Sequence, residues 1–181
     1  MSQPPPIFWI SGPPAAGKST LCELLLKEFE RGLHLRVDDL RSWAVQGFAD
    51  SVPWTDETER QFRIAEAAAC DVAGRYQDAG FAVAVDHCRN LPTLESAIAA
   101  HLRGRRIVKV CLMPELETNL QRNAMRTNKP FGADHLVETI EYTNKSYRTS
   151  IPDGWIVIDN TALSVKETVA QVFKAMDPTP A

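Results

Sequence analysis

The chain has 181 residues, of which 44% are hydrophobic and 24% are charged, and this balance is typical of one globular domain. Its net charge of −3 and isoelectric point near 5.8 argue against a protein that coats duplex DNA, because such proteins are usually basic. No apolar run approaches the roughly 20 residues of a membrane-spanning helix, so we expect no membrane partner.

Apolar runs alternate along the chain with helical patterns. Short, nearly continuous apolar runs predict buried strands at 6–11, 33–37, 81–85, 106–113 and 155–160. Apolar residues at helical spacing predict helices at 19–31, 56–77, 93–103, 115–127, 133–148 and 164–176. This alternation predicts an α/β fold with a parallel sheet covered on both faces. Ligands of such sheets bind at the carboxyl ends of the strands, so the residues after each strand are the candidates for function.

The segment after the first strand fits the phosphate-binding pattern G-x-x-x-x-G-K-S/T. Gly12 and Gly17 allow a tight concave loop whose N–H groups face phosphate oxygens at the start of a helix. Lys18 is expected to reach the β- and γ-phosphates, and the Ser19 hydroxyl is expected to bind Mg²⁺. The residues expected to contact the nucleotide are Gly12, Pro13, Pro14, Ala15, Ala16, Gly17, Lys18, Ser19 and Thr20.

After the second strand the chain reads "RVDDLR". If Asp38 opens a helical turn, Arg41 lies at i+3, and a carboxylate and a guanidinium are presented on one face. Phosphoryl transfer to a hydroxyl needs a group that orients the nucleophile, and Asp38 suits that task. The simpler alternative is a helix-capping aspartate beside a solvated arginine.

Asp86 ends the apolar run "FAVAV", a pattern typical of the carboxylate that holds Mg²⁺ near a phosphate loop. His87 follows directly and could contact a substrate, although a partly buried structural histidine is the simpler interpretation. Asn160 follows the fifth strand, where a side chain could accept a hydrogen bond from adenine or could simply form a turn.

Arg122 and Arg126 are four residues apart on one predicted helix, and Gly132 follows them. Paired arginines on a lid would counter the charge of a transferring phosphoryl group, so we expect a lid at about 122–148. A solvated basic helix face is the alternative.

Together these parts resemble the P-loop kinases of the nucleoside-kinase-like group, most of all the kinase half of polynucleotide 5′-hydroxyl kinases and the chloramphenicol phosphotransferase-like and zeta-toxin-like proteins. The resemblance covers nearly the whole chain through "GPPAAGKST", "DDLR", the strand ending at Asp86, and "LQRNAMR". It implies a three-layer fold with a five-stranded sheet in the order 2-3-1-4-5, a helical lid, ATP and Mg²⁺. It also implies Asp38 as general base, Arg41 on the acceptor side, and Arg126 with Arg122 as lid arginines.

The acceptor region is expected at about 41–62, where Trp43, Phe48 and Trp54 could wall an acceptor or form a small satellite core. The chain departs from the phage polynucleotide kinase pattern after Asp86, where it reads "DHCRNLPTLES". We therefore expect a single-domain ATP-dependent kinase acting on a hydroxyl of a small molecule. A polynucleotide 5′-hydroxyl kinase and a regulatory ATPase without an acceptor remain the alternatives. The four cysteines form no Cys-x-x-Cys pair, which predicts free thiols in a cytoplasmic protein.

Overall fold

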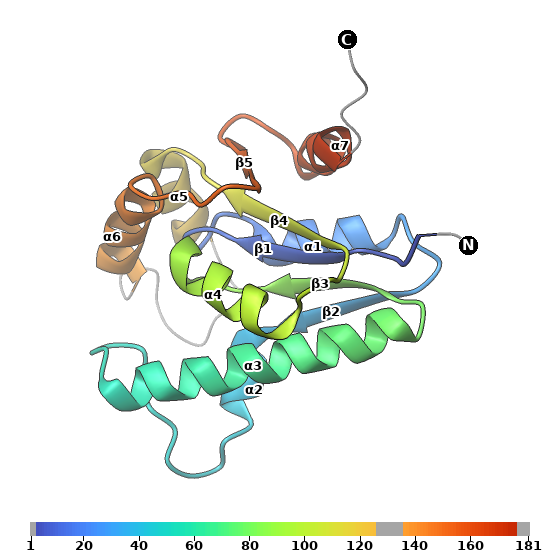
Figure 1. The fold of residues 1–181 in the computed structure, drawn as a ribbon. Helices are drawn as coiled ribbons and strands as arrows, with labels where there is room; N and C mark the ends of the chain where they lie inside the picture. The colour runs from blue at the N-terminus through green and yellow to red at the C-terminus, as the bar shows by residue number, and fades with distance from the viewer. Residues whose placement is uncertain (1–2, 126–135, 177–181) are drawn as a thin grey trace.

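The structure is a computed structural model that describes residues 3–125 and 136–176. Its centre is one parallel sheet in the order β2-β3-β1-β4-β5, which confirms the predicted order (Figure 1). The strands are β1 (Ile7–Ser11), β2 (Gly32–Arg36), β3 (Ala82–Asp86), β4 (Ile107–Leu112) and β5 (Trp155–Ile158).

Seven helices surround this sheet in the described parts of the chain. They are α1 (Lys18–Leu26), α2 (Val37–Ser42), α3 (Asp56–Asp78), α4 (Leu91–His101), α5 (Leu116–Ala124), α6 (Val137–Tyr147) and α7 (Val165–Met176). Helices α1 and α7 cover one face of the sheet, and α3 and α4 cover the other (Figure 1). Helix α2 directly follows β2, while α5 and α6 lie beyond the carboxyl end of β4 (Figure 1).

The alternation of side chains along the central strand explains the two hydrophobic cores. Ile7 and Trp9 of β1 face the core under α3 and α4, whereas Phe8 and Ile10 face the core under α1 and α7. All four side chains are fully buried, and burial of each stabilises the fold by about 1.5–3 kcal/mol. A strand buried on both faces reads as a continuous apolar run, which is why the sequence revealed it.

The N-termini of α1 and α3 differ in a way that bears on function. Thr55 caps α3, and its side chain accepts a hydrogen bond from the N–H of Thr58. Helix α1 begins after Gly17, and no side chain caps it. The first N–H groups of α1 therefore have no side-chain acceptor and are available to an anion.

The end of the first helix differs most from the sequence expectation. The first helix was expected to reach residue 31, but α1 ends at Leu26 and tight turns follow it. The chain reverses closely here to enter β2, since a Cβ on Gly32 would lie 2.9 Å from the Cβ of Leu26. The expected helices 115–127 and 133–148 correspond to α5 and α6, and their ends at 126–127 and 133–135 lie outside the described residues.

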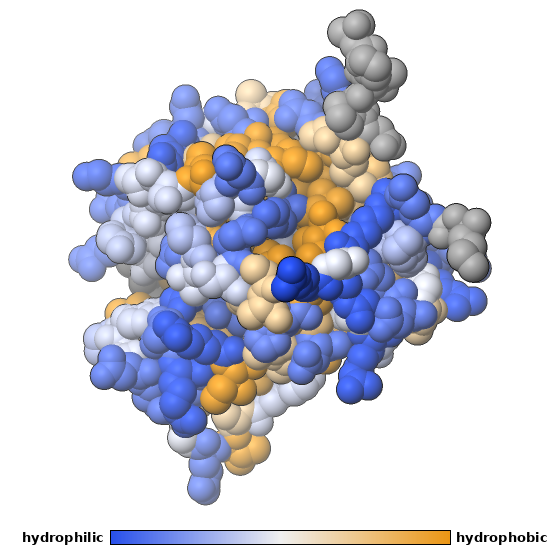
Figure 2. Space-filling view, in the orientation of Figure 1, coloured by the Kyte–Doolittle hydropathy of each residue, from blue (hydrophilic) through white to orange (hydrophobic). Residues whose placement is uncertain are grey.

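The space-filling view shows apolar surface over β4 and β5, beside α4 (Figure 2). Val157 of β5 is among the exposed apolar residues of this region. None of the helices in the described parts of the chain is long and apolar enough to cross a bilayer.

Candidate active site

The phosphate loop of residues 12–20 has the backbone conformation of a tight concave turn. Gly12 and Gly17 have φ values of 142° and 98°, which side-chain-bearing residues rarely adopt. A Cβ on Gly12 would lie 2.4 Å from the carbonyl oxygen of Leu112, so no larger residue fits there. Ala15 has a φ of 60° and is the one residue other than glycine with positive φ in the described chain. This conformation costs an alanine about 1 kcal/mol.

Lys18 lies over the loop that precedes it. Its Nζ donates hydrogen bonds to the carbonyl oxygens of Gly12 and Pro13, both at 3.0 Å. The ammonium group is therefore held by the loop itself, without a carboxylate partner among the described residues. An anion that enters the loop would meet an unneutralised cation.

Ser19 and Asp86 form the oxygen pair that the sequence predicted for Mg²⁺. The Ser19 hydroxyl donates a hydrogen bond to Oδ2 of Asp86, and His34 Nε2 lies 3.6 Å from the same oxygen. Burial opposes ionisation of Asp86, but His34, the Lys18 charge and the Ser19 hydroxyl outweigh it and lower the pKa of Asp86. A hydroxyl and an ionised carboxylate are suitable ligands for Mg²⁺, which usually takes its remaining ligands from water and phosphate.

The described residues contain no cluster of three or more His, Cys, Asp or Glu side chains that could hold a metal by themselves. The Ser19–Asp86 pair thus fits a metal that arrives with a phosphorylated ligand.

Two asparagines hold the outside of the phosphate loop, and the sequence had pointed to only one of them. Asn160 donates from Nδ2 to the carbonyl of Ala16 at 2.9 Å, and its Oδ1 is buried without a partner among the described residues. Asn119 of α5 is fully buried and donates from Nδ2 to the carbonyl of Pro14 at 2.6 Å. The loop is therefore fixed by side chains from distant parts of the chain.

Asp38 and Arg41 both lie on α2, as expected, but they differ in exposure. Asp38 is exposed in the first turn and has no hydrogen-bond or ion-pair partner in the described chain. Its neighbour Asp39 is paired with Arg36, with 2.6 Å between Oδ2 and the Arg36 nitrogen. Asp38 is thus the free carboxylate of the two.

Arg41 is only 6% exposed and points toward the segment that follows α2. Its guanidinium donates to the carbonyl of Ala49 at 2.6 Å and to the hydroxyl of Ser51 at 3.2 Å. It also lies over the ring of Phe62, 3.7 Å from the centroid. Burial lowers the pKa of Arg41, although the nearby Asp38 charge opposes this. Arg41 therefore fixes the segment between α2 and α3, which the sequence analysis expected to form the acceptor region, and the structure buries it instead of presenting it with the exposed Asp38.

His87 belongs to a buried network of charged groups that the sequence did not reveal. Its Nε2 lies 3.0 Å from Oε1 of Glu66, and the same oxygen accepts from Nε of Arg89 at 3.0 Å. Arg89 also donates to Glu59 at 2.6 Å. His87 is buried at the carboxyl end of β3, so it lies beneath the acceptor region rather than on its surface.

The aromatic residues of the acceptor region do not form a closed satellite core. Trp43 is 71% exposed and Trp54 is 48% exposed, and Phe48 is similarly open. Trp54 stacks on Phe62 with a centroid distance of 5.0 Å and an interplanar angle of 6°, while Arg89 lies 4.9 Å from the Trp54 centroid. Trp54 therefore has a fixed orientation and an accessible side.

Arg122 is directed at the loop after β5. It donates to the carbonyl of Asn160 at 2.8 Å, and burial lowers its pKa. Arg126, the other expected lid arginine, lies outside the described residues with the rest of 126–135, whereas α6 of the expected lid at 122–148 is described.

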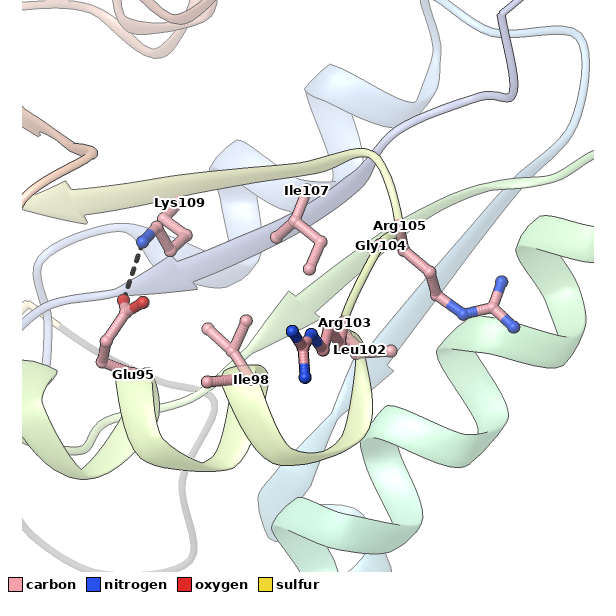
Figure 3. Close-up of a pocket in the computed structure, with 9 residues that line it drawn as sticks. Glu95, Ile98, Leu102, Arg103, Gly104, Arg105, Ile107 and Lys109 are labelled. Carbon is pink, nitrogen blue, oxygen red and sulfur yellow. Dashed lines mark hydrogen bonds and ion pairs between the residues drawn. The ribbon is translucent and has the colours of Figure 1, made fainter.

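A separate cavity of about 460 Å³ lies at the opposite end of the sheet, between α4 and the start of β4 (Figure 3). Two of its three cations are paired, because Lys109 contacts Glu95 at 2.7 Å and Arg105 contacts Asp78 at 2.7 Å. None of the expected site residues lines this cavity.

Comparison with known proteins agrees with this geometry at the level of the fold. No family model and no curated protein matches the sequence. Among solved structures, a sugar kinase from Janibacter sp. aligns with a TM-score of 0.68 and 17% identity, covering 98% of this chain and 97% of that one. The chain has the fold of the P-loop kinases. The APS kinase of Mycobacterium tuberculosis, solved with AMPPNP and APS, gives a TM-score of 0.66, 18% identity and coverage of 97% and 99%. The shikimate kinase of Acinetobacter baumannii, solved with shikimate, gives a TM-score of 0.60 and 19% identity, and the alignment covers 95% of this chain and 92% of that one.

Proposed function

We propose that this protein is a kinase that transfers the γ-phosphate of ATP to a hydroxyl group of a small-molecule acceptor. The observation that carries the proposal is the register of three neighbouring strands. Ile10 of β1 is paired with Asp86 of β3, and Asp86 is paired with Arg36 of β2. Because of this register, β1, β2 and β3 end side by side. The same edge of the sheet therefore carries the phosphate loop, the Asp86 carboxylate and Asp38, which is the arrangement that phosphoryl transfer requires.

Each group has a role in this proposal. Lys18 and the N–H groups at the start of α1 bind the β- and γ-phosphates. Ser19 and Asp86 hold Mg²⁺, which neutralises charge on the phosphate oxygens when it is bound. Asn160 holds the Ala16 carbonyl from the loop after β5, and we place the adenine beside that loop.

On the acceptor side, Asp38 orients the hydroxyl and accepts its proton. The acceptor region at about 41–62 is shaped by Arg41, Trp43 and Trp54. His87 lies buried beneath it and contacts Glu66 of α3. Arg122 and Arg126 act from a lid at about 122–148, which is the part of the proposal that rests on the sequence resemblance. The solved structures above include complexes with shikimate and with APS, which supports a small molecule as the acceptor.

The proposal is tested with labelled ATP, Mg²⁺ and a panel of acceptors that includes nucleosides, sugars, sugar acids, antibiotics and oligonucleotides with a free 5′-hydroxyl. We expect one class of small molecule to be phosphorylated. Asp38→Asn should bind ATP within about threefold of the parent, while transfer falls roughly 10²–10⁴-fold because the general base is lost.

Asp39→Asn is the matched control, because it removes the neighbouring carboxylate, which is already paired with Arg36. Its transfer rate should stay close to that of the parent. Equal rates for Asp38→Asn and the parent would make Asp38 a helix-terminal residue only. ATP hydrolysis without any phosphorylated acceptor would favour a regulatory ATPase, and labelling of oligonucleotides alone would favour a polynucleotide kinase.

A further inference from the structure

The two asparagines on the outside of the phosphate loop hold alternate peptide units. Asn119 binds the carbonyl oxygen of Pro14, and Asn160 binds that of Ala16. In a planar trans peptide the N–H group points opposite to the carbonyl. The N–H groups of Ala15 and Gly17 therefore point away from the asparagines, and neither donates to a protein group within residues 3–125 and 136–176.

The peptide unit held by Asn119 leads into the strained residue of the loop. Ala15, whose N–H belongs to that unit, has a φ of 60°. This left-handed conformation is unfavourable for a residue with a Cβ, and only glycine adopts it freely. Without an external partner for the Pro14 carbonyl, the peptide would be free to rotate toward a more favourable conformation of Ala15.

Asn119 is itself held in one orientation by α6. Asn144 donates from Nδ2 to Oδ1 of Asn119 at 3.0 Å and to the carbonyl of Pro114 at 2.9 Å. Asn119 and Asn144 are both at least nine-tenths buried. Since Oδ1 of Asn119 is occupied as an acceptor, its Nδ2 must face the loop. A chain of hydrogen bonds thus runs from α6 through α5 to the carbonyl of Pro14.

We propose that Asn119, oriented by Asn144, is a positioning residue that keeps the Pro14–Ala15 peptide turned so that the Ala15 N–H binds a phosphate oxygen. This inference rests on the proposed nucleotide-binding function. Asn119 does not touch the nucleotide and acts through the loop backbone. Replacing Asn119 with a smaller residue therefore lowers the affinity of the loop for phosphate groups, while the surrounding fold is kept.

The first test is titration of ADP with Mg²⁺, and of pyrophosphate alone, into the parent and three variants. Asn119→Ala should bind both probes about 10-fold more weakly, which corresponds to the loss of one oriented donor. Asn144→Ala should show a smaller loss of roughly 3-fold, because Asn119 keeps its place but not its fixed orientation. Ile140→Val is the matched control, since it trims a fully buried side chain of α6 and lowers stability without touching the hydrogen-bond chain.

The second test distinguishes positioning from a general loss of stability. Ala15→Gly relieves the left-handed strain, so it should recover ADP affinity in the Asn119→Ala background more than it changes affinity in the parent background. Equal effects of Ala15→Gly in both backgrounds would overturn the proposal. So would an Asn119→Ala variant with the parent's affinity for both probes. If Asn119→Ala does not fold, the same comparison is made with Asn144→Ala. A parent protein that binds neither probe would overturn the nucleotide-binding function itself.

Discussion

The phosphate loop and the acceptor region meet at the same end of the sheet, but they are built in opposite ways. In the loop, the carbonyls of Gly12, Pro13, Pro14 and Ala16 all have a side-chain donor. In the acceptor region, large apolar side chains between α2 and α3 face solvent, and Val45 is 96% exposed. Figure 2 shows this segment at the bottom of the molecule, projecting below α3.

This difference matches what each region would have to do. A phosphate group has one shape, so a loop that binds it gains from being pre-organised before the ligand arrives. Under the proposed function the acceptor region would recognise one particular molecule, and specificity of this kind is usually carried by connecting segments on the surface. We therefore expect substitutions in the loop to affect every nucleotide-dependent activity, and substitutions in the acceptor region to affect one substrate.

The largest expected effect is that of Lys18→Ala. This change removes the cation that lies over the phosphate loop, so both ATP hydrolysis and phosphate transfer should fall on the order of 10³-fold or more. Steady-state kinetics and ATP titration measure the effect. Lys27→Ala, just after α1, is a control that removes a lysine away from the loop. Parent-like ATP binding together with parent-like turnover in Lys18→Ala would contradict the central role of the loop.

The next effect concerns Arg122, which is bound to the carbonyl of Asn160 beside the loop. If it moves to the transferring phosphoryl group during the reaction, Arg122→Met should lower kcat about 10- to 100-fold with little change in ATP affinity. A change in the KM for ATP alone would show instead that Arg122 only holds the loop after β5. Steady-state kinetics at several ATP concentrations give kcat and the KM for ATP separately.

The same contrast governs what the sequence could reveal. The strands and the phosphate loop follow local patterns, since doubly buried strands read as apolar runs and the glycines of the loop have fixed spacing. The order of the strands came only from the resemblance to the P-loop kinases, and the structure confirms it. The Asn119–Pro14 contact joins residues 105 positions apart, and no local pattern marks it. Similarly, the i, i+3 spacing placed Arg41 on the same helix as Asp38. Its burial depends on Phe62, which lies on another helix.

A smaller effect is expected for Trp54, which belongs to the acceptor region. Trp54→Ala should raise the KM for the acceptor roughly 5- to 50-fold through the loss of stacking, while ADP affinity stays within about twofold. Trp54→Phe should recover part of the loss, because a ring can still stack on Phe62. Val45→Ala serves as the control for a fully exposed position of the same segment. An equal loss of ADP affinity in Trp54→Ala would remove the distinction between the two regions.

The smallest effect is on stability and its dependence on pH, and it involves the ion pair that supports Trp54. The hydrogen bond from Arg89 holds the pKa of Glu59 below its usual value of 4.5. The unfolded chain therefore binds a proton more readily at this position, and the pair stabilises the fold fully above about pH 4.5. This stabilisation is lost as the pH falls through the lower pKa of the folded state.

Glu59→Gln should consequently lower the melting temperature at pH 7 by about 2–4 °C, the shift expected for about 1 kcal/mol in a chain of this size. The difference from the parent should shrink as the pH is lowered below 4.5, because protonated Glu59 resembles glutamine. Glu57→Gln removes a carboxylate from the same helical turn whose partner Arg60 lies on the surface, so it should lower the melting temperature less than Glu59→Gln does. Melting curves of the three proteins from pH 7 to pH 3 measure this. A constant gap between Glu59→Gln and the parent at every pH would mean that the pair contributes packing rather than charge.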